Sequence, residues 1–490
     1  MPDSLLLRMD AGPRIGIGHV MRGLALAQAW HRRGGEVHMA TSLLHVPALA
    51  ERLVQEGVIL HQVESSSGSL EDAEGLAQLA EKVGSPGAVI DGYSFGLGFS
   101  ERFHHSGLRL MRIDDAPLVE VLGSDQVVNP NLYMPHRSLV TRTGQAEIFM
   151  GPRYALLREE FLVPPQRIAK AEAIRILVTL GGSDPAGVTD LIIHALARID
   201  LPLDVRVILG PAREGEVPGS AIEGQVTVLS DVQDMAVQMA WADLAIAGAG
   251  VACTELARCG VPVLALVQAV NQVPVAAAVD RLGLGWNLGW ERDEATLART
   301  IGALARDPEL RASMASLGPR LVDGKGALRV ARAWDIGGIH LRPVTADDGE
   351  RLFVWANDPE TRSMSFAPEP IPWETHLAWL QHRLAEPDHR FFIAEDLHGR
   401  CLGQVRFQTL STHEIISVGI DPQARGRGWG PRIIAKACDS LPPGSTVAAY
   451  IKLENKASHR AFEKAGFGPP VLTEWEGHRA MRMDFMEEGV

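Results

Sequence analysis

The sequence contains no run of apolar residues long enough to cross a bilayer, for which about 18 or more are needed. It has only four cysteines, and none of them stands in a CxxC pair or at the spacing of a zinc site. Its first residues lack the basic segment and apolar stretch of a secretory signal. These absences argue against a membrane-spanning, secreted or disulfide-stabilised protein. We expect a cytoplasmic protein whose cysteines are reduced.

Basic residues are also fewer than acidic ones, with 47 lysines and arginines against 60 aspartates and glutamates. The formal net charge is −13, and no basic tract is present that would follow a phosphate backbone, so no nucleic-acid partner is expected. The remaining composition, with 46% hydrophobic and 22% charged residues, is typical of a soluble globular protein. At 490 residues the chain exceeds one hydrophobic core, and at about 150 residues per domain it predicts three folding units.

The first two thirds of the chain alternate short β-rich runs with helical segments. The expected strands are residues 4–9, 37–41, 58–63, 88–90 and 108–113, then 174–180, 203–209, 226–229, 244–247 and 263–267. This alternation predicts an α/β protein with two doubly wound, Rossmann-like domains of mostly parallel sheet, at residues 1–162 and 163–335. Ligands of such sheets bind beyond the carboxyl ends of the strands, so the loops after strands are where chemistry is expected.

A different pattern begins after residues 335–338 (DIGG). Residues 339–344 predict a new strand, and a later strand at 415–420 leads directly into a loop rich in glycine and arginine. We expect a separate α+β domain at residues 339–490.

The first motif, residues 16–22 (GIGHVMR), lies between an expected strand and an expected helix. Its glycines let the backbone approach a ligand, and the following helix start presents free N–H groups to an anion. The imidazole of His19 would accept a proton from water near neutral pH. A histidine that only packs the helix start fits this spacing equally well.

Two similar turns occur in the second domain, at residues 180–185 (LGGSDP) and 248–251 (GAGV). Turns of this kind can hold a diphosphate, although each alone serves structure more often than ligand binding. Glu255 follows on the second turn of the next helix, where a carboxylate can bind ribose hydroxyls. With Asn271 and Gln272 after the next strand, the set favours a nucleotide-sugar pocket.

Taken in order, these blocks resemble the UDP-sugar hydrolases of pseudaminic acid biosynthesis, relatives of GT-B glycosyltransferases such as MurG. The resemblance covers about residues 6–332 and is carried by residues 8–10 (RMD), 16–22, 91–93 (DGY), 113–115 (IDD), 151–158 (GPRYALLR), 180–184, 250–255 and 271–272.

The resemblance implies metal-independent release of UDP from UDP-2,4-diacetamido-2,4,6-trideoxy-β-L-altropyranose by water that attacks the anomeric carbon. It makes His19 the base, puts Tyr93 and Asn271 near the sugar, and puts Glu255 at the ribose. The implied substrate-binding residues are Asp10, Gly18, Arg22, Tyr93, Gly181, Gly182, Ser183, Gly250, Val251, Glu255, Asn271 and Gln272. Ala252 and Gly96 depart from the hydroxyl and acidic residues common in the family, which leaves the exact sugar open.

The third domain carries a second pair of motifs. Residues 421–430 (DPQARGRGWG) follow a strand, and their alternate glycines expose backbone N–H groups to a pyrophosphate, with Arg425 and Arg427 adding positive charge. About 25 residues later, Asn455 and Ser458 open another helix. The pair resembles the GNAT acetyltransferases, which implies acetyl-CoA as cosubstrate and no metal.

The implied cofactor-binding residues are Val418, Ile420, Arg425, Gly426, Arg427, Gly428, Gly430, Asn455, Ser458 and Phe462. Many relatives have a tyrosine where this chain has Phe462, so the acid that protonates the CoA thiolate is unassigned.

Together the resemblances imply a bifunctional enzyme of pseudaminic acid biosynthesis, the pathway of flagellin glycosylation. One half would acetylate the 4-amino group of a UDP-amino-sugar, and the other would then remove UDP; no membrane partner is expected, and the oligomeric state is open. Four alternatives remain: a UDP-sugar glycosyltransferase, a legionaminic-type hydrolase, an acetyltransferase for protein N-termini, and a non-catalytic UDP-sugar-binding scaffold.

Overall fold

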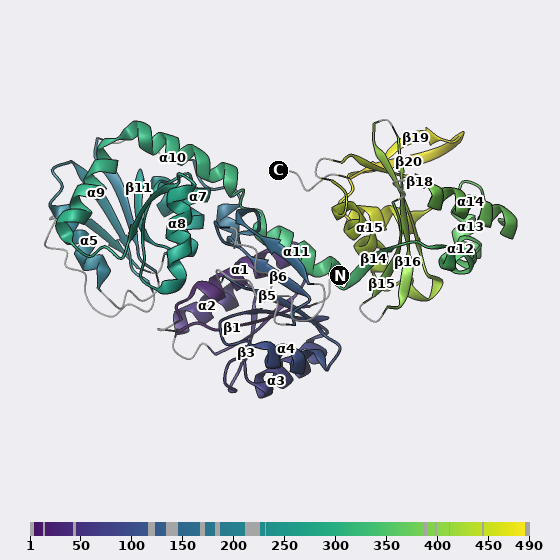
Figure 1. The fold of residues 1–490 in the computed structure, drawn as a ribbon, viewed down its shortest axis with the longest axis horizontal. Coiled ribbons are helices and arrows are strands. Elements are labelled where there is room, and N and C mark those ends of the chain that lie inside the picture. The colour runs from purple at the N-terminus through teal and green to yellow at the C-terminus, as the bar shows by residue number, and fades with distance from the viewer. Residues whose placement is uncertain are drawn as a thin grey trace. The chain divides into compact units, whose positions relative to one another are not determined.

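The computed structural model describes residues 4–12, 15–42, 46–115, 123–133, 146–166, 172–181, 187–210, 226–230, 232–386, 390–396, 399–410, 412–442 and 445–485. The chain forms two compact units, Met1–Trp334 and Asp335–Val490 (Figure 1). The expected α/β class, with two Rossmann-like domains followed by a mixed-sheet domain, is confirmed. Gly182 and Ser183, expected at the diphosphate, lie outside the described residues.

The first sheet has seven parallel strands in the order β3-β2-β1-β4-β5-β6-β7. Its strands are β1 (Leu5–Met9), β2 (Val37–Thr41), β3 (Ile59–Gln62), β4 (Gly87–Asp91), β5 (Arg109–Ile113), β6 (Gln126–Asn129) and β7 (Glu147–Met150). Its helices are α1 (Gly18–His31), α2 (Pro47–Gln55), α3 (Leu70–Val83) and α4 (Leu97–His104). Helices cover both faces, so a central strand such as β1 is buried along its whole length and is almost entirely apolar.

The second sheet has six parallel strands in the order β10-β9-β8-β11-β12-β13. They are β8 (Ile174–Thr179), β9 (Leu203–Ile208), β10 (Val226–Leu229), β11 (Leu244–Gly248), β12 (Val263–Leu266) and β13 (Gly285–Gly289). Its helices are α5 (Val188–Ala197), α6 (Met235–Trp241), α7 (Val251–Arg258), α8 (Val273–Arg281), α9 (Glu294–Arg306) and α10 (Pro308–Leu321), and short 3-10 turns stand at η1 (Pro152–Tyr154), η2 (Glu159–Phe161) and η4 (Val270–Gln272).

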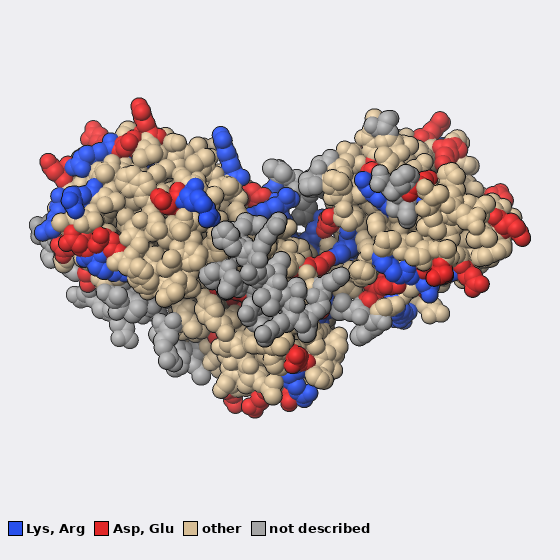
Figure 2. Space-filling view, viewed as in Figure 1, with Lys and Arg blue, Asp and Glu red and all other residues tan. Residues whose placement is uncertain are grey.

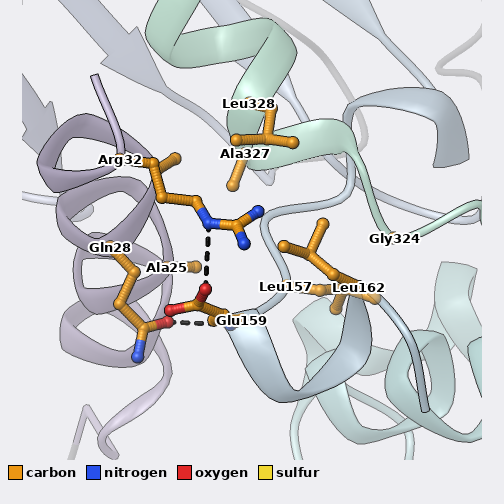
Figure 3. Close-up of a pocket in the computed structure, with 10 residues that line it drawn as sticks. Ala25, Gln28, Arg32, Leu157, Glu159, Leu162, Gly324, Ala327 and Leu328 are labelled. Atoms are coloured by element: carbon orange, nitrogen blue, oxygen red, sulfur yellow. Dashed lines mark hydrogen bonds and ion pairs between the residues drawn. The ribbon is translucent and has the colours of Figure 1, made fainter. Parts of the chain in front are cut away.

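Helix α11 (Gly326–Ile336) returns to the first sheet after the second domain is complete. Trp334 is buried in the core of the first domain, where its carbonyl accepts a hydrogen bond from Arg109 Nη1 at 3.0 Å. Figure 3 shows the small recess lined by α1, α11 and the connector between the two domains (residues 151–165), with the Arg32–Glu159 ion pair of 2.9 Å at its edge. The two Rossmann-like domains are therefore joined by two chain crossings.

The second unit contains a seven-stranded mixed sheet in the order β14-β15-β16-β17-β18-β20-β19. Its strands are β14 (Ile339–Pro343), β15 (Phe391–Asp396), β16 (Cys401–Thr409), β17 (Glu414–Ile420), β18 (Val447–Lys452), β19 (Val471–Trp475) and β20 (His478–Asp484). Its helices are α12 (Gly349–Ala356), α13 (Pro359–Ser363), α14 (Trp373–Ala385), α15 (Trp429–Asp439) and α16 (Lys456–Lys464), with 3-10 turns η5 (Ala346–Asp348) and η6 (Pro422–Ala424). One face of the sheet packs on α15 and α16, and the other packs on α12 and α14.

Strands β17 and β18 are parallel neighbours, but their pairing ends at Ile415 and Ala448. The strands separate beyond this point, toward the loop that follows β17. On the face shown in Figure 2, acidic and basic side chains of the described residues are interspersed over each unit. None of the helices in the described ranges is both long and apolar enough to span a bilayer.

Candidate active sites

The first site lies at the carboxyl edge of the first sheet, where β1 and β4 are neighbours and the strand order reverses direction. Such a switch point is where doubly wound sheets bind ligands. Helix α1 starts there with Gly18 and His19, and Asp91 is the last residue of β4. His19 Nδ1 lies 2.6 Å from Asp91 Oδ1, and both side chains are buried. The fold thus brings together a histidine and a carboxylate that are distant in the sequence.

Arg22, one turn further along α1, fixes the charge of Asp91. Its Nε and Nη2 donate to the two carboxylate oxygens at 2.7 and 2.8 Å. Burial alone would raise the pKa of Asp91, but the charges of Arg22 and His19 and their hydrogen bonds lower it below its ordinary value. His19 Nδ1 also lies 2.9 Å from Arg22 Nη2, which can only donate, so the two neighbours of this nitrogen favour opposite tautomers. The contact with the Asp91 carboxylate is the shorter one, at 2.6 Å, and it favours the tautomer in which Nδ1 carries the hydrogen and donates it. In the neutral imidazole, Nε2 is then the basic nitrogen.

A second layer of contacts surrounds this pair. Arg22 Nη1 also donates to Asp115 Oδ2 at 3.0 Å, and the Tyr93 hydroxyl lies 3.4 Å from the same oxygen. Burial and the Asp115 charge raise the pKa of Tyr93 to about 12, so this residue remains a neutral phenol at physiological pH. The Tyr93 ring meets His19 edge to face, with 5.0 Å between ring centroids.

The second domain reaches this site through η4. Asn271 Nδ2 donates to the Tyr93 hydroxyl at 2.9 Å. Tyr93 is nevertheless 60% exposed, so a ligand can still contact it. The structure therefore brings together the predicted base His19, the predicted substrate-binding residue Arg22, and Tyr93 and Asn271, the two residues predicted near the sugar.

Asp10, predicted with them, has a different environment. Its Oδ1 accepts a hydrogen bond from the Ser42 backbone at 2.8 Å and pairs with Arg8 Nη1 at 2.8 Å. These contacts tie the end of β1 to the residue after β2.

Sequence reasoning assigned no role to Asp91 or Asp115, although both stand in blocks that carry the resemblance. Asp91 ends one buried strand, and Asp115 follows the next one, β5, closely. Their signal in the sequence is an aspartate at or just after the carboxyl end of β4 or β5, the two strands that follow β1 in the sheet.

Of the predicted diphosphate turns, Gly181 and the turn at Gly250 are described, and they follow β8 and β11, the neighbouring strands at the switch point of the second sheet. Gly181 follows β8 with a positive φ of +97°, which favours glycine, and Gly250 precedes Val251 at the start of α7. These two turns therefore share one edge, as a diphosphate site requires. Gln272 lies nearby and accepts a hydrogen bond from the backbone of Gln268 at 2.9 Å.

Glu255 of α7 is buried, and its Oε1 accepts a hydrogen bond from Arg158 Nη2 at 2.9 Å. Arg158 also pairs with Glu160 Oε1 at 3.2 Å. One oxygen of Glu255 is thus already bonded to the connector between the domains. Among the residues that the structure describes, no group of three or more histidine, cysteine, aspartate or glutamate side chains is arranged to hold a metal ion.

The candidate cofactor loop of the second unit follows β17. Gly426 and Gly428 have positive φ angles of +74° and +79°, and a Cβ on either would meet no atom within 4 Å. Gly428 immediately precedes α15, and the free N–H groups of the first turn of that helix can bind an anion. The backbone conformation of this loop and the free space around its two glycines therefore suit the binding of a pyrophosphate.

The two arginines of this loop differ. Arg425 forms ion pairs with Asp358 at 2.6 Å and Glu360 at 2.7 Å, which hold α13 against the loop. Arg427 is exposed and forms no ion pair with a described residue. Of the two side chains, Arg427 is thus the one available to a ligand.

The other predicted cofactor residues fall into two groups. Val418 and Ile420 lie on the part of β17 that has separated from β18, and Gly430 packs near Ile420 and Ala461. Asn455 caps α16 by accepting a hydrogen bond from the Ser458 N–H at 3.0 Å. Phe462 is buried in the core against Phe467.

Comparisons with known proteins agree with this division. Residues 339–468 match the acetyltransferase (GNAT) domain family. The spore coat polysaccharide biosynthesis protein SpsG of Bacillus subtilis is 33% identical over 218 residues, which are 42% of this chain and 63% of SpsG. The match therefore spans less than two thirds of that relative's length.

Two further comparisons concern the larger part of the chain. An uncharacterised protein of Methanocaldococcus jannaschii is 22% identical over 430 residues, which are 82% of this chain and 83% of that protein. The matched segment is longer than the first unit, so it includes part of the second unit as well. MurG of Acinetobacter baumannii covers 67% of this chain and 98% of its own with a TM-score of 0.50 and 15% identity, which shows a shared fold. The chain thus joins a homologue of SpsG, with the GT-B fold of enzymes such as MurG, to a GNAT acetyltransferase domain.

Proposed function

We propose that the first unit hydrolyses UDP from UDP-2,4-diacetamido-2,4,6-trideoxy-β-L-altropyranose. The observation that carries this proposal is the buried His19–Asp91 pair, with Tyr93 and Asn271 from different domains bonded beside it. His19 Nε2 takes a proton from water as the water oxygen bonds to the anomeric carbon. The bond from that carbon to the UDP oxygen breaks, and UDP leaves with the electron pair. Asp91 stabilises the imidazolium that forms.

The second Rossmann-like domain would hold the nucleotide. Backbone N–H groups after Gly181 and Gly250 would bind the diphosphate, and Glu255 would contact the ribose. The similarity to a polysaccharide biosynthesis protein and the glycosyltransferase fold support a nucleotide-sugar substrate.

Glycosyl transfer to a sugar acceptor is a second candidate, favoured by the fold shared with MurG. The dependence of UDP release on an added sugar acceptor separates the two, and reaction in ¹⁸O-water shows whether water attacks carbon or phosphorus. Attack of water on the anomeric carbon yields unlabelled UDP without any added acceptor. UDP is the correct readout because a reducing sugar exchanges its anomeric oxygen with water. Labelled UDP, or UDP release only when a sugar acceptor is present, would show the hydrolase proposal to be wrong.

We also propose that the second unit acetylates the 4-amino group of the corresponding UDP-amino-sugar with acetyl-CoA. The loop at Gly426 and Gly428 would bind the pyrophosphate, and the open edge of β17 at Val418 would polarise the thioester carbonyl. The amine nitrogen bonds to that carbon, the carbon–sulfur bond breaks, and the amine proton passes through water to the thiolate. Mass spectrometry of the sugar nucleotide after incubation with acetyl-CoA tests this step. Acetylation of a peptide amine but not of the sugar nucleotide would contradict it.

A further inference from the structure

Three arginines gather on the face of the acetyltransferase sheet that packs on α12 and α14. Arg406 lies on β16, and its guanidinium carbon stands 5.1 Å from the centre of the Trp379 ring of α14. Arg383 of α14 donates from Nη2 to the carbonyl of Phe407, the residue after Arg406, at 2.9 Å. The charge of Arg362, on α13, also acts on Arg406, and we call these three residues the arginine cluster.

Little negative charge in the protein balances this cluster. The Arg406 guanidinium makes no hydrogen bond or ion pair with a described residue. Arg362 donates only to neutral oxygens, such as the Ala367 carbonyl at 3.0 Å and the Ser365 hydroxyl at 2.8 Å. Arg383 alone has an acidic partner, Glu386, at 2.9 Å.

The surroundings of the cluster change the pKa of Arg406. Burial, followed by the charges of Arg383 and Arg362, lowers the pKa of Arg406 to about 10. Keeping like charges together in a partly buried place costs free energy. Glu386 beside Arg383 and Glu369, whose charge acts on Arg362, offset part of this cost, but no described carboxylate pairs with Arg406.

Polar atoms beside the cluster are also unpartnered. The Nε atoms of Arg362 and Arg383 and the Oε1 atom of Gln404 are buried without a hydrogen-bond partner. Gln404 stands two residues before Arg406 on β16, so it faces the same side of the sheet. Folded proteins leave few buried polar groups unpaired, so these atoms are available to hydrogen-bond a bound ligand or water.

The strand register puts the cluster beside the proposed reaction. Arg406 pairs with Ser417, and Gln404 pairs with Gly419, so both side chains lie over β17. This strand leads into the Gly426–Gly428 loop and has separated from β18 over these residues. An amine that approaches a thioester on the open edge of β17 from this face passes the arginine cluster.

We infer that the arginine cluster, with Arg406 at its centre, binds a phosphate or diphosphate group of the acceptor. This inference rests on the proposed acetyl transfer and specifies its acceptor class: an amine joined to a phosphate ester. Planar guanidinium groups bind phosphate oxygens in bidentate pairs. The same three cations repel polyamines and basic peptides.

The test compares two acceptors, UDP-4-amino-4,6-dideoxy-N-acetyl-altrosamine and the same amino-sugar without its nucleotide. Wild type is expected to have a KM for the UDP-linked sugar about 10–100-fold below that for the free sugar, the value of one or two charge-assisted hydrogen bonds. Arg406→Gln should raise the KM for the UDP-linked sugar by about the same factor and leave the KM for acetyl-CoA unchanged. The Arg406→Lys variant keeps the charge, so its KM for the UDP-linked sugar should lie between those of wild type and Arg406→Gln. Arg400→Gln, on an exposed turn, is the matched control and should behave as wild type.

The outcomes separate the inference from the function on which it rests. If wild type acetylates the UDP-linked sugar and Arg406→Gln leaves its KM unchanged, the inference is overturned and the proposed function stands. If only uncharged or cationic amines are acetylated, both are overturned. Inhibition by UDP, competitive with the acceptor and lost in Arg406→Gln, gives a second readout. An unchanged rise in melting temperature with acetyl-CoA would show that the variant is folded.

Discussion

Replacing Asp91 by asparagine tests the arrangement of the first site. The carboxylate accepts three hydrogen bonds, one from His19 and two from Arg22, and asparagine keeps its shape with one acceptor oxygen only. If that oxygen serves Arg22, the amide NH₂ faces His19 Nδ1 and favours the tautomer in which Nε2 carries the hydrogen. His19 then no longer acts as a base, and kcat for UDP release should fall by about 10²–10⁴-fold with little change in KM.

The same substitution removes a negative charge beside buried Arg22, so the free energy of unfolding should fall by about 3–5 kcal/mol. Asp72→Asn is the matched control, because Asp72 is equally buried and pairs with Arg8 Nε at 2.9 Å in the same domain, away from His19. UDP release is measured by chromatography and divided by the folded fraction found by denaturant titration. Both variants should lose stability, but only Asp91→Asn should lose kcat. Equal rates for the two folded variants would refute the positioning role of Asp91.

Three further predictions concern both units. His19→Ala should lower UDP release by about 10²–10⁴-fold without affecting acetyl transfer, and near-wild-type release would remove His19 as the base. Because the pKa of native Asp91 lies below its ordinary value, its stabilising contribution is complete above about pH 4 and is lost as the pH falls through the native pKa. The stability difference between wild type and Asp91→Asn should thus shrink below about pH 4, and a difference that grows in acid would contradict the charge assignment. Gly428→Val puts a side chain on a backbone with φ of +79° in the pyrophosphate loop, and should abolish acetyl transfer while UDP release from a pre-acetylated substrate survives; unchanged acetyl transfer would exclude this loop from cofactor binding.

Much of the fold follows from local sequence. Strands buried on both faces, such as β1 and β4, are short apolar runs, and their alternation with helices predicts parallel sheets. In the two parallel sheets the prediction omits β6, β7 and β13, which are four or five residues long and include glutamine, glutamate or asparagine. Their pairing with a neighbouring strand, rather than their own composition, makes them strands. In the mixed sheet the prediction includes only β14 and β17. The return of α11 to the first core likewise depends on contacts with residues more than 200 positions away.

The sites divide in the same way. A glycine turn between a strand and a helix is a local feature, so the positions of His19, Gly250 and Gly428 follow from the sequence. The partner of each side chain does not. Asp91 becomes the partner of His19 only because β4 lies beside β1. Arg425, predicted to add charge at the cofactor, instead pairs with acidic residues on or beside α13, and no local pattern indicates that contact.

If the two units catalyse successive steps on one sugar nucleotide, as proposed, acetyl-CoA should control the release of UDP. The most direct test is UDP release from the 4-amino sugar nucleotide, measured with and without acetyl-CoA. A hydrolase pocket shaped for an acetamido group would have to desolvate an ammonium without regaining its contacts, so release should be slow until acetyl-CoA is added. We expect acetyl-CoA to accelerate UDP release markedly in wild type and not in the Gly428→Val variant. Equally fast release from the unacetylated sugar nucleotide, with or without acetyl-CoA, would contradict the proposed sequence of steps.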